Sequence, residues 1–293
     1  MNISVIIPVY KNKYQFLQNL KNNLEYLNNE EIIIINDDPS VSLQKKLAKI
    51  FNIILIENKT NLGFGQSVNI GVSKSTNNFI LLLNTDVVLH DQNYKLSLDH
   101  FKNNKSLFAV AFAQKEKNDL NVGKNIIYWE NGFLRHKKAD NQSFGYSAWA
   151  EGGSCLFDKK KFELLGGFDP IYKPFYWEDV DLGYRAWKAG YQIIFDPKIL
   201  VEHQHESTIR KYFSQKFIRQ ISFRNQLIFI WKNIKDGSLL RDHVKNLVLL
   251  TLTSLLKGNF IFIRSLTAAL IKMTSFKTVK KSVRSDIDIL NIF

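Results

Sequence analysis

The sequence predicts an α/β fold in which a mainly parallel central sheet is flanked by helices, followed by a basic helical C-terminal region. Short, continuous apolar runs recur along the first 90 residues, and stretches of helical length separate them. Such runs are typical of strands buried on both faces, and their alternation with helices is typical of a parallel sheet. Several runs also end in acidic residues. Because ligands of these sheets bind beyond the carboxyl ends of the strands, the acidic residues mark a candidate site.

The elements of this fold can be placed along the chain. In order, we expect a strand at 3–10, a helix at 13–28, and further strands at 31–36, 52–57, 79–86 and 192–195. Asp37 and Asp38 directly follow the second strand, and Asp86 ends the fourth. These carboxylates are therefore expected at the ligand-binding edge of the sheet.

The segment Phe175–Arg185 has an unusual concentration of acidic residues. Glu178, Asp179 and Asp181 fall within four residues, directly behind three aromatic side chains. Like charges packed this closely repel, and aromatic neighbours reduce their solvation, so at least one carboxyl pKa is expected to be raised. A carboxylate in that state can take a proton from a hydroxyl group. An ordinary acidic helix start, which favours the helix dipole, accounts for the same pattern.

Six motifs connect these segments to a known family. They cover about the first 205 residues, in the order Val5–Tyr10, Asn36–Ser40, Asn61–Gly71, Leu83–Asp86, Gly166–Asp169 and Trp177–Leu182. Together they resemble the inverting glycosyltransferases of family 2, which have the Rossmann-like GT-A fold. Within that family the combination is most similar to bacterial rhamnosyltransferase-like enzymes of surface polysaccharide synthesis. The resemblance implies transfer of a sugar, rhamnose among the candidates, from a nucleotide-diphosphate donor to a hydroxyl of a lipid-linked or growing surface glycan.

The resemblance also implies roles for individual residues. Asp179 matches the base that takes the proton of the acceptor hydroxyl, and Glu178 is expected to bond the acceptor or the sugar. Asp181 is expected to orient the helix, with Arg185 one turn on as its partner. The donor is expected to contact Pro8, Val9, Tyr10, Asp37, Asp38, Gly65, Asn69, Asn84, Thr85 and Asp86. The acceptor is expected to contact Trp149, Gly152, Gly153 and Trp177.

A divalent metal, Mg²⁺ or Mn²⁺, is expected beside the donor diphosphate, because hard oxygen ligands suit these ions. The family usually places an Asp-any-Asp pair after the fourth strand, but this chain reads Asn84-Thr85-Asp86. Asp86 is therefore the remaining charged ligand, and strict metal dependence stays open. His203 is the second expected ligand, with His205 as the alternate because residues two apart on an extended segment share a face.

Several of these features also fit ordinary structural roles. Asp37 and Asp38 precede Pro39 and fit an ordinary turn, and Trp149 and Trp177 also fit core packing. The chain as a whole also fits a catalytically inactive nucleotide-sugar-binding protein or a membrane-associated scaffold. Residues 114–150, where acceptor specificity is expected, predict only a variable hairpin or a mobile loop.

The positive charge is concentrated at the C-terminal end. The net charge is +13, and residues 207–293 hold sixteen Lys and Arg against four acidic residues. This shift predicts a catalytic domain at 1–206 and a basic helical region at 207–293. Basic helices with an apolar stripe suit the anionic inner leaflet of a membrane, whereas packing on the catalytic domain or on a second subunit is the alternative. No nucleic-acid-binding motif accompanies the charge, so nucleic acid is not an expected partner.

Cysteine content and the N-terminus bear on the compartment. The single cysteine, Cys155, excludes an internal disulfide and is expected to be a small buried hydrophobe. A reducing cytosol is the natural setting for such a chain. The first apolar run is short and has no basic stretch before it, so no signal peptide is expected. We therefore expect a cytoplasmic protein, peripheral at the inner face of the cell membrane.

Overall fold

The computed structural model describes residues 2–27, 29–48, 50, 52–115, 121–204, 211–273 and 282–293. The strands of its central sheet are β1 (Ile3–Val9), β2 (Glu31–Asn36), β3 (Ile53–Glu57), β4 (Phe79–Leu83), β5 (Val87–Leu89), β6 (Leu107–Lys115), β7 (Asn121–Val122), β10 (Gly145–Tyr146), β11 (Ser154–Asp158) and β12 (Gln192–His203). The path through the sheet is β10-β12-β6-β11-β4-β1-β2-β3, with β5 added to β12 and β7 to β6. Strands β1 to β4 are mutually parallel, β12 is parallel to β6, and β11 runs antiparallel between β4 and β6. The expected mainly parallel sheet is therefore confirmed.

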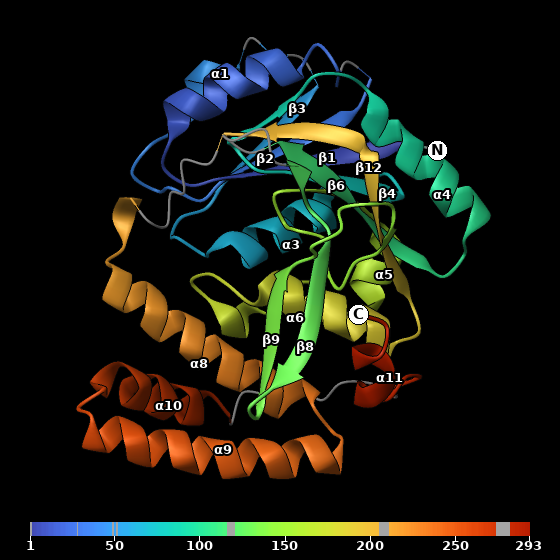
Figure 1. Ribbon diagram of the computed structural model, residues 1–293. Helices are drawn as coiled ribbons and strands as arrows, with labels where there is room; N and C mark the ends of the chain where they lie inside the picture. Colours follow the sequence, from blue (N-terminus) through green and yellow to red (C-terminus); the bar gives the residue numbers. More distant parts are fainter. Residues whose placement is uncertain are drawn as a thin grey trace.

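The sheet is covered on both faces because its central strands are apolar on both faces. In β1, Ile6 packs in one core with Val68 of α3 (Phe64–Lys74). The next residue, Ile7, packs in a second core with Phe16 of α1 (Lys13–Asn23). Figure 1 shows α1 and α3 on opposite sides of the strands. Cys155 of β11 is buried and free, as expected.

The first helix ends at Asn23 instead of continuing to residue 28. The side chain of Asn23 is buried, donates to the carbonyl oxygen of Val87 at 2.9 Å and accepts from the amide of Leu89 at 2.8 Å. These bonds tie the helix end to β5. The fourth strand likewise ends at Leu83, so residues 84–86 form a turn and not the strand end that the sequence predicts.

The strand expected at 192–195 continues to His203. Its register against β6 shifts between Asp196 and Leu200, and beyond this irregularity β12 pairs with both β6 and β5. Such a bulge lets a strand resume pairing after an interruption. In the sequence, Asp196-Pro197-Lys198 resembles the end of a strand, so its continuation to His203 is not predicted. His203 therefore lies at a strand end and not in a loop.

The region 114–150 contains ordered strands. β8 (Asn125–Glu130) and β9 (Phe133–Lys138) form an antiparallel hairpin whose register runs from Asn125 opposite Lys138 to Glu130 opposite Phe133. The structure thus favours the hairpin over the mobile loop for the described part of this region. Short helices elsewhere are α2 (Gln44–Leu47), η1 (Asn93–Leu96), α4 (Ser97–Asn103), α5 (Lys159–Leu164) and η2 (Pro170–Tyr172).

The basic region forms helices that pack on the rest of the chain. They are α8 (Gln215–Asn233), α9 (Gly237–Leu256), α10 (Phe260–Lys272) and α11 (Asp286–Leu290). Figure 1 shows α8, α9 and α10 gathered beyond α6 (Glu178–Lys188), with the β8–β9 hairpin reaching towards them. Leu227 to Ile230 of α8 are buried in the same core as Trp177 and Tyr184. Among the described residues, no helix is both long and apolar enough to cross a bilayer.

Candidate active site

A cavity of about 600 Å³ opens at the carboxyl-end edge of the parallel strands. Most of the site residues predicted from the sequence line this cavity. Phe213 and Ser222 also line it, so the cavity includes residues from both sides of the boundary predicted at residue 206. The predicted residues in its wall are Pro8, Val9, Tyr10, Asp37, Asn84, Thr85, Asp86, Trp149, Gly152, Gly153, Trp177, Glu178, Asp179 and His203.

Strand direction explains why these distant residues meet. Tyr10, Asp37 and Asp86 follow three parallel strands, so they share one edge of the sheet. β11 runs the other way, so Gly153, which directly precedes its first residue, reaches the same edge. β12 is antiparallel to β5 and places His203 opposite Val87, directly beside the turn that carries Asp86.

Asp38, Gly65 and Asn69 lie outside this cavity, contrary to the expectation for donor-binding residues. Asp38 is paired with Lys11, with Nζ to Oδ2 at 3.2 Å, and lines a neighbouring hollow. A Cβ at Gly65 would lie 2.9 Å from the Cβ of Phe168, so this glycine permits close helix packing. The side chain of Asn69 exchanges two hydrogen bonds with the backbone of Phe168, at 2.7 and 2.9 Å. Gly65 and Asn69 therefore pack α3 against the segment that contains Phe168.

Asp37 shapes the loop that begins α3. Its carboxylate accepts hydrogen bonds from the backbone amides of Leu62 and Gly63 and from the side chain of Asn58, each at 2.8 Å. The loop approaches the cavity where Gly63 has a φ of +85°, a conformation that favours glycine. Asp37 thus fixes the backbone around the cavity and also lines it.

Asp86 and His203, the two metal ligands that the sequence predicts, lie side by side in the cavity wall. The Nε2 of His203 lies 3.3 Å from Asp86 Oδ1. Its Nδ1 lies 2.6 Å from the amide oxygen of Gln114, whose amide nitrogen donates to Glu151 at 2.7 Å. Because the carboxylate of Glu151 only accepts, the amide oxygen of Gln114 must face His203. His203 therefore donates through Nδ1, and its other ring nitrogen, Nε2, is the one that faces Asp86.

This arrangement fits a divalent ion. A metal-binding histidine usually donates its other ring N–H to an oxygen, as His203 does to Gln114. Within the described ranges, no three or more His, Cys, Asp or Glu side chains cluster as a metal site, so a divalent ion here would have at most Asp86 and His203 as such ligands. Mg²⁺ and ions like it often bind through one or two protein ligands together with water and substrate phosphates. His205, the alternate, lies outside the described residues.

Glu178 and Asp179 begin α6, and both face the cavity. Burial raises the pKa of both carboxyls; the charge of Asp179 adds to this at Glu178, and that of Glu151 adds to it at Asp179. A hydrogen bond of 2.8 Å from the amide of Val180 to Asp179 opposes part of the rise. Glu178 Oε2 is buried and has no hydrogen-bond partner in the described part of the chain. The expected rise in pKa is confirmed, and it suits groups that exchange protons near neutral pH.

The turn before these carboxylates is strained and is held by α8. Tyr176 and Trp177 both have positive φ, at 70° and 77°, which costs about 1–2 kcal/mol per residue. The fully buried side-chain amide of Asn225 lies within 2.8–2.9 Å of the carbonyl oxygens of Tyr172, Phe175 and Tyr176. The C-terminal region therefore supports the segment that presents Glu178 and Asp179.

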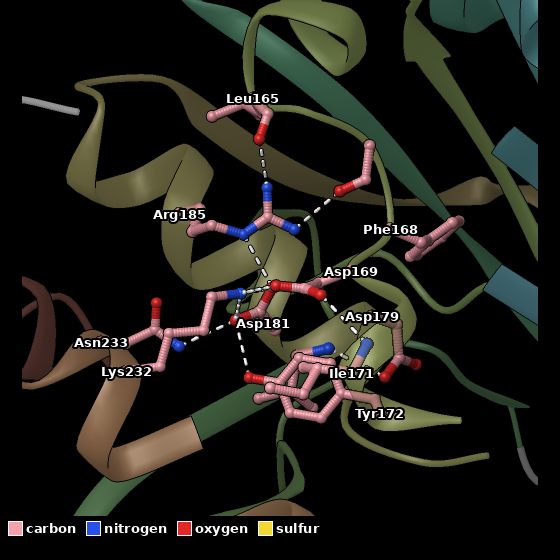
Figure 2. Close-up of polar contacts among 12 residues, drawn as sticks. Leu165, Phe168, Asp169, Ile171, Tyr172, Asp179, Asp181, Arg185, Lys232 and Asn233 are labelled. Carbon is pink, nitrogen blue, oxygen red and sulfur yellow. Dashed lines mark hydrogen bonds and ion pairs between the residues drawn. The ribbon is translucent and has the colours of Figure 1, made fainter. Parts of the chain in front are cut away.

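Asp181 has a structural place in the fold. It is fully buried and accepts from Arg185 Nε at 2.7 Å, which confirms the expected partner. Lys232 and Asn233 of α8 also donate to it, at 2.9 and 2.8 Å, as does the Tyr172 hydroxyl (Figure 2). Although burial alone would raise it, Arg185 and Lys232 hold the pKa of this carboxyl well below its usual range. Asp179 lies outside this cluster (Figure 2).

Two residues that the sequence did not point to, His136 and Glu151, also line the cavity near Trp149 and Trp177. The His136 ring stands edge-on to the rings of Trp149 and Trp177, with centroids 5.3 and 5.1 Å apart. Glu151 adds another carboxylate to the wall, and it directly precedes Gly152 and Gly153, which could have drawn attention to it. His136 carried no such signal, because it lies in the middle of a hairpin with few recognisable features.

Comparison with known proteins identifies relatives of this chain. Residues 4–166, more than half of the sequence, match the family model described as glycosyl transferase family 2. The chain is 25% identical over 227 residues to the O-antigen chain rhamnosyltransferase RfbN of Salmonella typhimurium strain LT2, a match that covers 74% of this chain and 71% of RfbN.

Solved structures share the same architecture. GalNAc-T7 with UDP, GalNAc and Mn²⁺ superposes with a TM-score of 0.63 at 13% identity, covering 79% of this chain and 48% of that one. The mannosyltransferase PcManGT of Pyrobaculum calidifontis, in complex with GDP-Man and Mn²⁺, gives a TM-score of 0.56 at 15% identity, covering 94% and 76%. At these identities the likeness concerns the fold, which is of the GT-A type.

Proposed function

Because the chain belongs to glycosyl transferase family 2, we propose that it transfers a sugar, with inversion at the anomeric carbon, from a nucleotide-diphosphate donor to a glycan hydroxyl. The acceptor is a lipid-linked or growing cell-surface glycan, as the resemblance to RfbN supports, and rhamnose is the first sugar to test. One observation carries the proposal: Asp37, Asp86, Asp179 and His203, far apart in sequence, line a single cavity.

In the proposed reaction Asp179 acts as the base. The acceptor oxygen attacks the anomeric carbon from the face opposite the nucleotide, and the bond from that carbon to the phosphate oxygen breaks. The nucleoside diphosphate leaves, and the proton of the acceptor hydroxyl moves to the Asp179 carboxylate. Burial and the neighbouring Asp179 charge raise the pKa of Glu178, so a protonated Glu178 can donate a hydrogen bond to the sugar or acceptor.

The donor is assigned to the side of the cavity formed by β1, β2 and β4. Pro8, Val9 and Tyr10 border the nucleotide, and Asn84 and Asp86 face the sugar and diphosphate. A divalent ion held by Asp86 and His203 would neutralise charge on the diphosphate as it leaves.

The experiment that tests the function is a donor screen. Purified protein is incubated with dTDP-, UDP- and GDP-sugars, with Mg²⁺ or Mn²⁺, and nucleotide release is measured with and without acceptor extracts. Turnover by wild type and its loss in Asp179→Asn support the proposal. Binding without release in both proteins would instead favour an inactive nucleotide-sugar-binding protein, and the absence of any binding would refute the assignment.

We also propose that the basic region contacts the cytoplasmic membrane surface. Side chains of α9 and α10, here called the α9–α10 face, are exposed and apolar: Val244, Val248, Leu249, Leu252, Leu255, Leu256, Phe260, Leu270 and Ile271. Lys245, Lys257 and Arg264 are on the same helices or directly at their ends. An apolar surface bordered by cations suits an anionic leaflet.

Vesicle flotation tests this contact. We expect wild type to float with phosphatidylglycerol vesicles more than with phosphatidylcholine vesicles, and Leu252→Glu to reduce flotation. Leu164→Glu, at an exposed leucine of α5, serves as the control. If wild type does not float but forms a dimer that Leu252→Glu dissociates, as judged by light scattering, the face binds a second subunit instead of a membrane.

A further inference from the structure

A second, smaller cavity of about 250 Å³ borders the candidate active site. It lies between β9 and α8 and shares His136, Trp177 and Ser222 with the larger cavity. Because Trp177 directly precedes Glu178 and Asp179, the smaller cavity adjoins the side of the site assigned to the acceptor.

Two arginines line the smaller cavity. They are Arg135 and Arg219, and among the residues that the structure describes no carboxylate lines it. The Nε of Arg135 is buried and has no hydrogen-bond partner in the described part of the chain, although the side chain as a whole is 38% exposed and pairs with the carboxylate of Glu130 at 3.8 Å. A phosphate oxygen in the cavity would give this Nε a hydrogen-bond acceptor. Arginine is well suited to phosphate oxygens because its donors form a planar fork.

Helix α10 packs beside the smaller cavity. Phe223, which lines the cavity, contacts the ring of Phe262 in α10, with centroids 5.9 Å apart, and Phe262 is buried. The helix that carries part of the α9–α10 face therefore adjoins the smaller cavity. A lipid-linked sugar would place its sugar in the larger cavity, its phosphate in the smaller cavity and its lipid along α10.

We propose that Arg135 and Arg219 bind the phosphate or diphosphate that joins the acceptor sugar to its lipid carrier. The inference rests on the proposed function and names the acceptor class: an anionic, lipid-linked sugar. Its sugar lies by Trp177 and the α6 carboxylates, and its phosphate lies in the smaller cavity. The donor diphosphate is assigned elsewhere, because neither Asp86 nor His203 lines the smaller cavity.

Calorimetric titration with defined probes tests this site. Farnesyl diphosphate, inorganic pyrophosphate and farnesol are titrated into the full chain with EDTA present, so that no metal draws a diphosphate to Asp86 and His203. We expect farnesyl diphosphate to bind at least about tenfold more tightly than pyrophosphate or farnesol. Arg135→Gln and Arg219→Gln should each weaken its binding by about tenfold, the effect of one charged hydrogen bond. Lys137→Gln, at an exposed residue of the same hairpin that pairs with Asp140, should have no effect.

The outcomes separate the possible sources of phosphate. Equal binding of pyrophosphate, with the same dependence on the arginines, would indicate a site for free phosphate and overturn the acceptor assignment. Competition by phosphatidylglycerol vesicles at the same arginines would indicate a phospholipid headgroup and also overturn it. Unchanged affinity in both arginine variants would refute the site.

A second arginine variant controls for misfolding, and nucleotide binding controls for failure of the proposed function. Arg219 is exposed, so Arg219→Gln tests the site even if Arg135→Gln fails to fold. UDP and Mn²⁺ are titrated into the same preparations. If UDP and the other donors of the screen do not bind wild type, the proposed function fails, whereas normal nucleotide binding together with arginine-independent farnesyl diphosphate binding refutes only the acceptor subsite.

Discussion

Asn225 of α8 should control the position of the catalytic carboxylates without touching the substrate. Its buried side-chain NH₂ lies within hydrogen-bond distance of three carbonyl oxygens of the turn that ends in Trp177 and shares its two N–H groups among them. The turn contains two left-handed residues, so it lies about 2–4 kcal/mol above a relaxed backbone. Leaving buried carbonyl groups unpaired costs about 1–3 kcal/mol each, although part of the turn can reach water in the cavity.

Because these hydrogen bonds oppose the strain of the turn, the turn should relax when Asn225 is replaced by Ala. We expect the free energy of unfolding to fall by about 2–4 kcal/mol. We also expect kcat to fall by about 100-fold, because a displacement near 1 Å of catalytic groups has an effect of that size. The KM for the donor should change little, since β1, β2 and β4 form the donor side.

Urea unfolding and steady-state kinetics with the donor found in the screen measure both quantities. Asn77→Ala is the matched control: Asn77 also donates to a backbone carbonyl, that of Ile3 at 3.0 Å, but at the opposite edge of the sheet. It should lower stability and leave kcat unchanged. If Asn225→Ala keeps kcat within twofold of wild type, the idea that α8 positions the carboxylates is refuted.

Three further predictions concern the charged groups of the site. Asp179→Asn should lower kcat by about 10²–10⁴-fold. The same change should raise the free energy of unfolding at pH 7.5, because burial raises the folded-state pKa of this carboxyl and its ionisation therefore opposes folding. In urea unfolding the gain should vanish near pH 3, and a variant less stable than wild type at pH 7.5 would contradict this. Asp181→Asn should cost about 3–5 kcal/mol at pH 7, because Arg185 and Lys232 lose a buried partner. Since the pKa of Asp181 is lowered in the folded state, its contribution to stability is present above the ordinary carboxyl pKa and should be lost as the pH of urea unfolding is lowered. If the difference in unfolding free energy between wild type and Asp181→Asn does not change with pH, the stabilising ion pairs of Asp181 with Arg185 and Lys232 are refuted. Gln114→Ala should weaken Mn²⁺ binding in the presence of UDP by about tenfold, because it removes the hydrogen-bond acceptor of His203 Nδ1. If the affinity measured by calorimetry is unchanged, His203 is not a metal ligand oriented by Gln114.

Much of the cavity could be predicted from the sequence because strand ends and helix starts are local features. The apolar runs at Ile3–Val9 and Phe79–Leu83 identify buried strands, and parallel strands bring their following residues to one edge. Asp86 could therefore be placed without coordinates. His203 was harder to place, because the bulge in β12 hides the strand that carries it.

The sequence by itself determined the sheet, the α6 carboxylates and the basic character of the C-terminal region. Only the tertiary structure decided that α8 supports the candidate active site, through the hydrogen bonds of Asn225 to the turn and of Lys232 to Asp181. It likewise decided that His136 stands between two tryptophans. The physical reason is that periodicity and charge report which face of an element is apolar, whereas a buried hydrogen bond depends on which partner is packed against that face.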